Sequence, residues 1–141
     1  MTVGEGYEFF DHTADIGIRA TGRTQEELFV RMAQGLIELL VEDSVLAPTT
    51  RRAVHVSADR IDTLLLAWLQ ELLFWFSTER FLPAQYTFTT MTATSLEGEV
   101  QGDIFDRSRH AQGREVKAIT RHLLEVRQRH GAWQGQVIVD I

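Results

Sequence analysis

Residues 16–40 read IGIRATGRTQEELFVRMAQGLIELL, and this stretch has the pattern of a strand followed at once by a helix. Apolar residues alternate with polar or small ones over positions 16–20, which is the period of a half-buried strand. Gly22 breaks the strand, and Thr24 with Glu27 three residues later forms the capping box of a helix start. The helix is expected to bury one face, which consists of Leu28, Phe29, Met32, Ala33, Leu36, Ile37 and Leu40.

A second helix is predicted at about residues 60–78, with Asp59 as its cap and Asp62 near the positive end of its dipole. Its apolar residues cover almost the whole circumference, which is typical of a helix buried on more than one side. We therefore expect it to pack between the sheet and the first helix. The alternative is an exposed aromatic stripe through Trp68 and Trp75 that binds a partner.

The remaining periodic segments predict strands. Pro83 ends the second helical region, and Gly131 is expected to supply a hairpin turn. The order strand, helix, strand, helix and then a run of strands implies one α+β domain over residues 1–141, with two helices packed on one face of a mostly antiparallel β-sheet. The predicted later strands are residues 54–58, 86–89, 96–102, 116–120, 123–128 and 133–141.

The composition excludes several classes of protein. The chain is 44% hydrophobic and 24% charged, which is typical of a globular protein, and it has no cysteine, so disulfides and thiolate metal sites are excluded. No secretory signal pattern is seen, and the most apolar stretch, residues 61–76, is too short to span a bilayer. We therefore expect a cytoplasmic protein that does not contact a membrane.

The charge is unevenly distributed along the chain. The net charge is −6, yet the segment from Arg107 to Arg129 holds seven of the 14 basic residues and two acidic ones, a local excess of five positive charges. This band could face an anionic partner, or it could be a solvated arginine-rich surface. Lys117, in this band, is the one lysine of the chain.

The residues that could bind a metal are carboxylates near the two ends. The apolar run 133–141 ends with Asp140 and Ile141. Near the other end of the chain, Asp15 is the last residue of the segment DHTAD at residues 11–15, just before the first predicted strand. If these residues meet, their carboxylates and the terminal carboxylate would repel one another without a cation, and calcium accepts such irregular oxygen sites. The alternatives are that Asp140 is a solvated residue on an edge strand and that Asp11 caps a turn.

Three segments, together with the capped helix after Gly22, resemble the archease family, and they span essentially the whole chain in the expected order and length. They are YEFFDHTADIG at residues 7–17, HAQGREVKAIT at 110–120 and VIVDI at 137–141. The resemblance implies an accessory protein rather than an enzyme. Archeases activate the RtcB-type RNA ligase of tRNA splicing by promoting its guanylylation and its multiple turnover.

The resemblance also implies which residues form the site. The metal of the family carries over to Asp15, Asp140 and the main chain or terminal carboxylate of Ile141, with calcium expected and magnesium as another hard cation. His12 and Lys117 would contact the ligase partner, and RNA would be met indirectly through the ligase. Arg121 departs from the family, which often has an aromatic residue after the threonine.

Two other functions are compatible with the residues. A metal-dependent phosphoester hydrolase could use Asp15 and Asp140 to activate water, although no nucleophile elbow, P-loop, dinucleotide fingerprint or zinc motif is present. A chaperone-like interaction module could use the apolar second helix.

Overall fold

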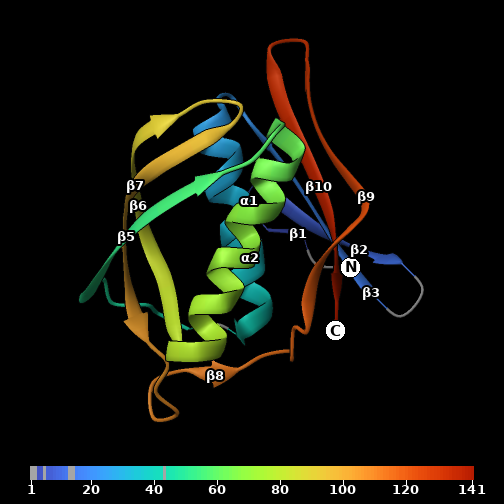
Figure 1. Ribbon diagram of the computed structural model, residues 1–141. Helices are drawn as coiled ribbons and strands as arrows, with labels where there is room; N and C mark the ends of the chain where they lie inside the picture. Colours follow the sequence, from blue (N-terminus) through green and yellow to red (C-terminus); the bar gives the residue numbers. More distant parts are fainter. Residues whose placement is uncertain (1–2, 5, 13–14, 43) are drawn as a thin grey trace.

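Two β-sheets enclose a pair of helices in the computed structural model of the chain (Figure 1). The structure describes residues 3–4, 6–12, 15–42 and 44–141, with the backbone alone for residues 3, 4, 11 and 12. The elements in chain order are β1 (Val3–Gly4), β2 (Tyr7–His12), β3 (Asp15–Gly22), α1 (Gln25–Leu40), β4 (Val41–Glu42), β5 (Thr50–Ser57), α2 (Ile61–Glu79), β6 (Phe81–Met91), β7 (Ser95–Ile104), β8 (Ala111–Gln112), β9 (Ala118–Arg129) and β10 (Ala132–Asp140).

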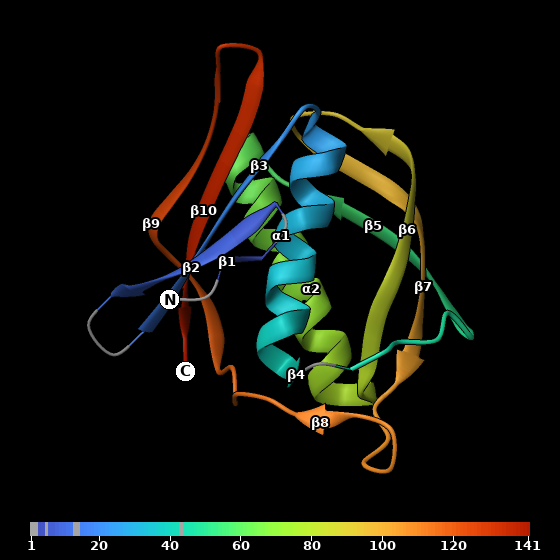
Figure 2. The ribbon, with the colours of Figure 1, turned by 180° about the vertical axis from the view of Figure 1, so that it is seen from behind.

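Both large sheets are antiparallel and turn one face to the helices. One sheet has the strand order β1-β2-β3-β10-β9, and the other has the order β5-β7-β6, while β4 and β8 form a separate two-stranded ladder. Figures 1 and 2 show α1 and α2 between the two large sheets when the molecule is viewed from either side. The predicted α+β class is confirmed, and the predicted single sheet is divided into layers on both sides of the helix pair.

Helix α1 begins as its sequence predicts. The Thr24 hydroxyl accepts a hydrogen bond from the Glu27 N–H at 3.1 Å, which caps one free donor of the first turn. The Glu27 carboxylate accepts from the N–H of Arg23 at 3.0 Å, so the capping box closes one residue earlier than expected. Every residue of the predicted apolar face is buried.

Helix α2 begins by a different device from the one predicted. Asp59 lies one position too early to cap it, because Arg60 is the residue that precedes the first helical turn. The Arg60 N–H instead donates to the Thr63 hydroxyl at 3.2 Å. Asp62 does lie in the first turn, where it accepts from the Thr63 N–H at 2.7 Å.

The aromatic residues of α2 belong to the core. Trp68 is fully buried and donates its indole N–H to the Phe29 carbonyl at 3.0 Å, while Trp75 is 5% exposed. The alternative of an exposed stripe through Trp68 and Trp75 is therefore wrong. Phe74 is the exception on this helix, with 59% of its surface exposed.

Strand β6 starts earlier than its sequence suggests. Pro83 lies inside the strand, where the register with β7 shifts between Pro83 and Gln85. Proline is tolerated here because β6 is an edge strand, in which one side of the backbone needs no sheet partner. Within the described part of the chain, neither helix is long and apolar enough to cross a bilayer.

Candidate functional site

Asp15 and Asp140 lie opposite each other on the neighbouring antiparallel strands β3 and β10. The same row continues to His12 on β2 and to Ala118 on β9. Directly opposed residues of an antiparallel pair have Cβ atoms about 4.5–5.5 Å apart. The structure thus brings together two carboxylates from distant parts of the chain, which we call the aspartate pair. Because β10 runs between β3 and β9, the alternative of Asp140 on an edge strand is wrong.

The aspartate pair points to the sheet face that is turned away from the helices. Ile16 and Val139, the next opposed residues, are buried in the core, and side chains alternate between faces along a strand. Asp15 and Asp140 are half-buried, and neither carboxylate accepts a hydrogen bond from another described residue. Opposed like charges destabilise a sheet, so the pair favours a cation from outside the chain.

An aromatic ring covers the adjacent row on the same face. Gly17 lies opposite both Phe10 and Ile138, and a Cβ atom at Gly17 would be 2.0 Å from Cζ of Phe10. The ring therefore occupies the space where any side chain at position 17 would lie. The Arg19 guanidinium stacks 4.4 Å from the Phe10 ring centroid, and Ile138 is fully buried. The aspartate pair thus borders low-polarity surface, which strengthens its attraction for a cation.

Lys117 is held beside the aspartate pair by its backbone. Its N–H donates to the carbonyl oxygen of Asp140 at 2.8 Å, while its side chain is exposed. Just upstream, the N–H groups of Gly113 and Arg114 donate to carbonyl oxygens of the last turn of α1 at 2.9 and 2.7 Å. A Cβ atom at Gly113 would be 2.3 Å from the Leu39 oxygen, so this close approach needs glycine.

For two of the predicted residues, Asp11 and His12, the structure describes the backbone alone. The backbone of His12 belongs to the row of the aspartate pair, and the backbone of Asp11 belongs to β2. Their side chains lie outside the described residues, so contact of His12 with a partner and capping by Asp11 stay predictions.

The donor set at the aspartate pair fits a hard cation. Among the described residues, no group of three His, Asp or Glu side chains could hold a metal ion unaided. Two opposed carboxylates and the main-chain oxygens of Ile141 would nevertheless supply oxygen ligands from one strand end. The Ile141 side chain packs against the core, which fixes the position of these oxygens. Calcium completes such irregular sets with water or with oxygens from a partner.

A second carboxylate site, which the sequence did not reveal, lies at the end of β7 and is bonded by the loop that follows. Asp103 is 3% exposed, and its Oδ2 accepts from the Ala47 N–H at 2.9 Å and from Arg109 at 2.8 Å. Its Oδ1 accepts from the Ile104 N–H at 2.9 Å and from the second guanidinium nitrogen of Arg109 at 3.0 Å. Hydrogen bonds from Arg109, aided by the backbone donors, hold the pKa of Asp103 far below its usual range against the opposing effect of burial.

His110 completes this network as a neutral ring. Its Nδ1 accepts from the Asp106 N–H at 2.9 Å, so Nε2 carries the proton and donates to Asp103 at 3.2 Å. The His110 side chain is fully buried, and both ring nitrogens have partners. This arrangement joins residues 103–110 to one another and to the segment of Ala47. The spacing of these residues carries no motif, so only the structure could identify the network.

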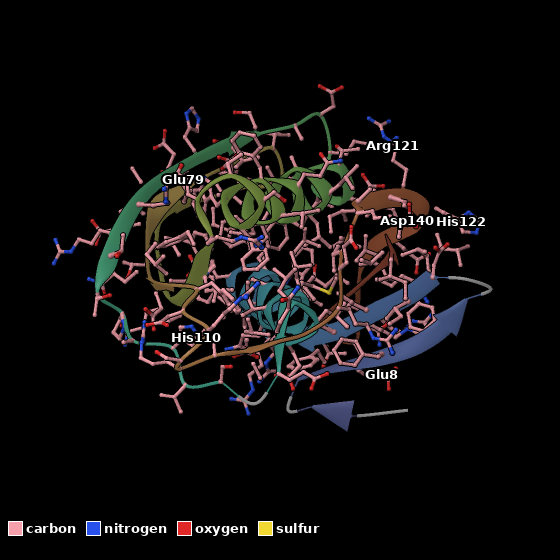
Figure 3. All side chains as sticks on the ribbon, turned by 90° about the horizontal axis from the view of Figure 1, so that it is seen from below. Glu8, Glu79, His110, Arg121, His122 and Asp140 are labelled. Carbon is pink, nitrogen blue, oxygen red and sulfur yellow. The ribbon has the colours of Figure 1, made fainter. Side chains whose placement is uncertain are left out.

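Residues 121–124 form a bulge in β9, because they face Val137 alone on β10. The predicted strands at 116–120 and 123–128 are therefore one strand with an irregularity. Leu123 has a positive φ of 54° and is 47% exposed, and the Gln136 amide donates to its carbonyl at 2.8 Å. The labelled bulge residues in Figure 3 lie on the same side of the molecule as Asp140. Bulges often redirect side chains next to functional sites.

The basic band is partly neutralised. Arg109 pairs with Asp103 at 2.8 Å, and Arg127 pairs with Glu125 at 3.1 Å. Within the ranges that the structure describes, the other basic residues of the band form no ion pair, namely Arg107, Arg114, Lys117, Arg121 and Arg129.

Known proteins resemble the chain over its whole length. A family model described as the archease protein family matches residues 7–141. Protein archease of Pyrobaculum neutrophilum is 35% identical over 147 residues, which cover 100% of both chains. Protein archease of Sulfurisphaera tokodaii is 33% identical over 136 residues, covering 96% of this chain and 98% of the relative.

Two solved structures share the fold. The solution structure of protein 1598 of Methanobacterium thermoautotrophicum has a TM-score of 0.83 at 32% identity and covers 98% of this chain and 100% of that one. The crystal structure of a Thermotoga maritima protein, described as an archease and possible chaperone, has a TM-score of 0.69 at 21% identity, with 94% of each chain covered. With a family model and full-length relatives in agreement, the chain belongs to the archease family.

Proposed function

We propose that this protein activates an RtcB-type RNA ligase in tRNA splicing or RNA repair, by promoting guanylylation of the ligase and its multiple turnover. Membership of the archease family supports the proposal. The observation that carries it is the aspartate pair, in which Asp15 and Asp140 lie in one register position beside the backbone of Lys117. Carboxylates without internal donors, next to an exposed lysine, are suited to contact a partner.

A divalent cation, with calcium preferred, is part of this proposal. The carboxylates of Asp15 and Asp140 and the main-chain oxygens of Ile141 would hold it, because these are hard oxygen ligands. The ion would neutralise the opposed charges of the pair and present open coordination positions to the partner.

The protein would act on the ligase by selective binding. A ligand shifts a conformational equilibrium only by its different affinity for the two states. The aspartate pair would recognise groups that are exposed in one state of the ligase, and the Lys117 ammonium would meet an anionic group such as a phosphate of its bound nucleotide. His12, whose backbone lies in the same row, would extend the contact.

Reconstitution with the cognate ligase and GTP tests the proposal. Asp15→Ala, Asp140→Ala and Lys117→Ala should each lower ligase guanylylation and turnover. For the aspartates we expect a loss of about 100-fold, because replacing a residue that merely hydrogen-bonds to a metal ligand already costs about 10–100-fold. Asp59→Ala is the control, since Asp59 is an exposed carboxylate away from the pair.

Two results would reject the proposal. One is full activation by the Asp140→Ala variant and by a variant with a short extension after Ile141. The other is hydrolysis of nucleotides or phosphoesters by the protein without the ligase, since this would favour the hydrolase alternative.

A further inference from the structure

A cavity of about 320 Å³ lies between the ends of α1 and α2 and residues 112–116. Its floor is apolar and consists of buried side chains, Leu40 of α1, Phe76 of α2 and Val116. This volume lies near the lower end of the range for small-molecule sites, which is about 300–1,000 Å³. The cavity is therefore large enough for a small ligand with a polar head and an apolar body.

Two arginines give the cavity its polarity. Arg80 and Arg114 line it from opposite segments, together with the Ser77 hydroxyl and the Gln112 amide. Within the described residues neither guanidinium forms an ion pair, although acidic residues pair with other arginines nearby. The Arg80 guanidinium stacks 5.0 Å from the Phe76 ring centroid, which limits its orientations. Among the described residues neither guanidinium donates a hydrogen bond to a protein acceptor, so the five N–H donors of each arginine are open to a ligand.

Helix capping does not account for these guanidinium groups. Cations are favoured near helix C-termini, where carbonyl oxygens lack partners. Here backbone donors already reach carbonyls at both helix ends, and among the described residues neither guanidinium donates to a helix carbonyl. The Arg80 N–H donates to the Phe76 oxygen at 2.9 Å, and the Gly113 and Arg114 N–H groups donate to the end of α1 at 2.9 and 2.7 Å. The guanidinium donors are thus left for another acceptor.

We propose that this cavity binds a phosphate ester of mononucleotide size. Paired guanidinium groups match the geometry of phosphate oxygens, and a hydroxyl and an amide add neutral donors. The apolar floor would contact the sugar or base of the ester. Glu115 also lines the cavity, so its side chains carry two positive charges and one negative charge. Glu115 therefore weakens the attraction for anions. Its replacement by glutamine should strengthen anion binding, whereas replacement of either arginine should weaken it.

Binding can be measured by NMR on the isolated protein, without ligase or divalent metal. Inorganic phosphate and then adenosine monophosphate are titrated at constant ionic strength, and a short RNA is compared with and without a terminal phosphate. Saturable shifts are expected at the amides of Ser77, Arg80 and Gln112. A stronger response to the phosphorylated RNA than to the mononucleotide would identify an RNA end as the source of the phosphate.

Matched variants separate the site from general charge effects. Arg80→Gln and Arg114→Gln should each weaken binding about tenfold or more, as is expected for a lost charge-assisted hydrogen bond. Glu115→Gln should strengthen it. Arg107→Gln removes the same charge from an exposed arginine outside the cavity and should leave affinity unchanged. Unfolding midpoints are compared in parallel, so that loss of binding is separated from loss of fold.

Three outcomes overturn the proposal: shifts that do not saturate, equal weakening by Arg107→Gln and Arg114→Gln, or chloride producing the same shifts as phosphate. None of these outcomes bears on ligase activation, because the proposed activation depends on the aspartate pair and is measured with the ligase present.

Discussion

Asp103 and the aspartate pair are acidic sites of one chain with opposite surroundings. Asp103 is almost fully buried and receives hydrogen bonds from two backbone N–H groups, a guanidinium and an imidazole. Asp15 and Asp140 are half-buried, face each other and receive no hydrogen bond from another described residue. The supply of internal donors thus separates a carboxylate that stabilises the fold from two carboxylates whose charges no described residue neutralises.

Removing the satisfied carboxylate should have the largest effect on stability. Asp103→Ala should lower the free energy of unfolding by about 3–4 kcal/mol, because several buried donors lose their acceptor at once. Urea denaturation measures this loss. Asp106→Ala is the control, since Asp106 has a 46% exposed side chain and its pairing with Arg109 is worth less than about 1 kcal/mol. A loss below about 1 kcal/mol for Asp103→Ala would remove the distinction between the two sites.

The stabilisation by the Asp103 carboxylate should depend on pH. Hydrogen bonds from Arg109 lower the pKa of Asp103 in the folded protein, whereas an unfolded aspartate titrates near about 3.9. The stabilisation is therefore complete above about pH 4 and is lost as the pH falls toward the folded pKa. The stability difference between the parent and Asp103→Asn should shrink below about pH 4.

Calcium should stabilise the protein through the other site. At 100 times its dissociation constant, a bound ion raises the free energy of unfolding by about 2.7 kcal/mol. Thermal denaturation with calcium and with a chelator measures this effect. Asp15→Ala and Asp140→Ala should abolish it, whereas Asp59→Ala should retain it. If calcium stabilised all three variants equally, the ion would not be bound by Asp15 and Asp140.

The smallest expected effect is a small increase in the stability of the protein. In the presence of a chelator, Asp15→Asn should raise the free energy of unfolding by about 0.5 kcal/mol, because it removes one of two opposed like charges. Urea denaturation with replicate measurements can resolve this difference. Destabilisation by Asp15→Asn would mean that the Asp15 carboxylate has a stabilising role in the free protein.

The sequence predicted those elements that depend on residues close to one another in the chain. The Thr24 cap and the apolar stripe of α1 are confirmed, because both depend on residues within a few positions. The turn at Gly131 is also confirmed, with φ values of 53° at His130 and 77° at Gly131. The residues alone left open whether Asp15 and Asp140 meet; the family resemblance implied it, and the strand register agrees.

Features that depend on distant residues were missed. Asp103 reads as a loop residue, and its burial depends on Ala47, which is 56 residues away in the chain. The exposed strand edge that accommodates Pro83 is a property of the whole sheet, so proline appeared to end the region. The division into two sheets likewise follows from tertiary packing, because alternation along a strand does not specify which strands pair.

The place of β10 in the sheet has a consequence for the order of folding. Arg19 and Gln136 are neighbours across β3 and β10, although 117 positions separate them in the chain. Contacts between such distant segments form slowly, because a long loop must close before any of them is made. We therefore expect the two aspartates to come together late in folding, and a fluctuation that detaches β10 would separate them while both helices remain formed. Hydrogen exchange at the amides of β10 would report how often the chain opens in this way.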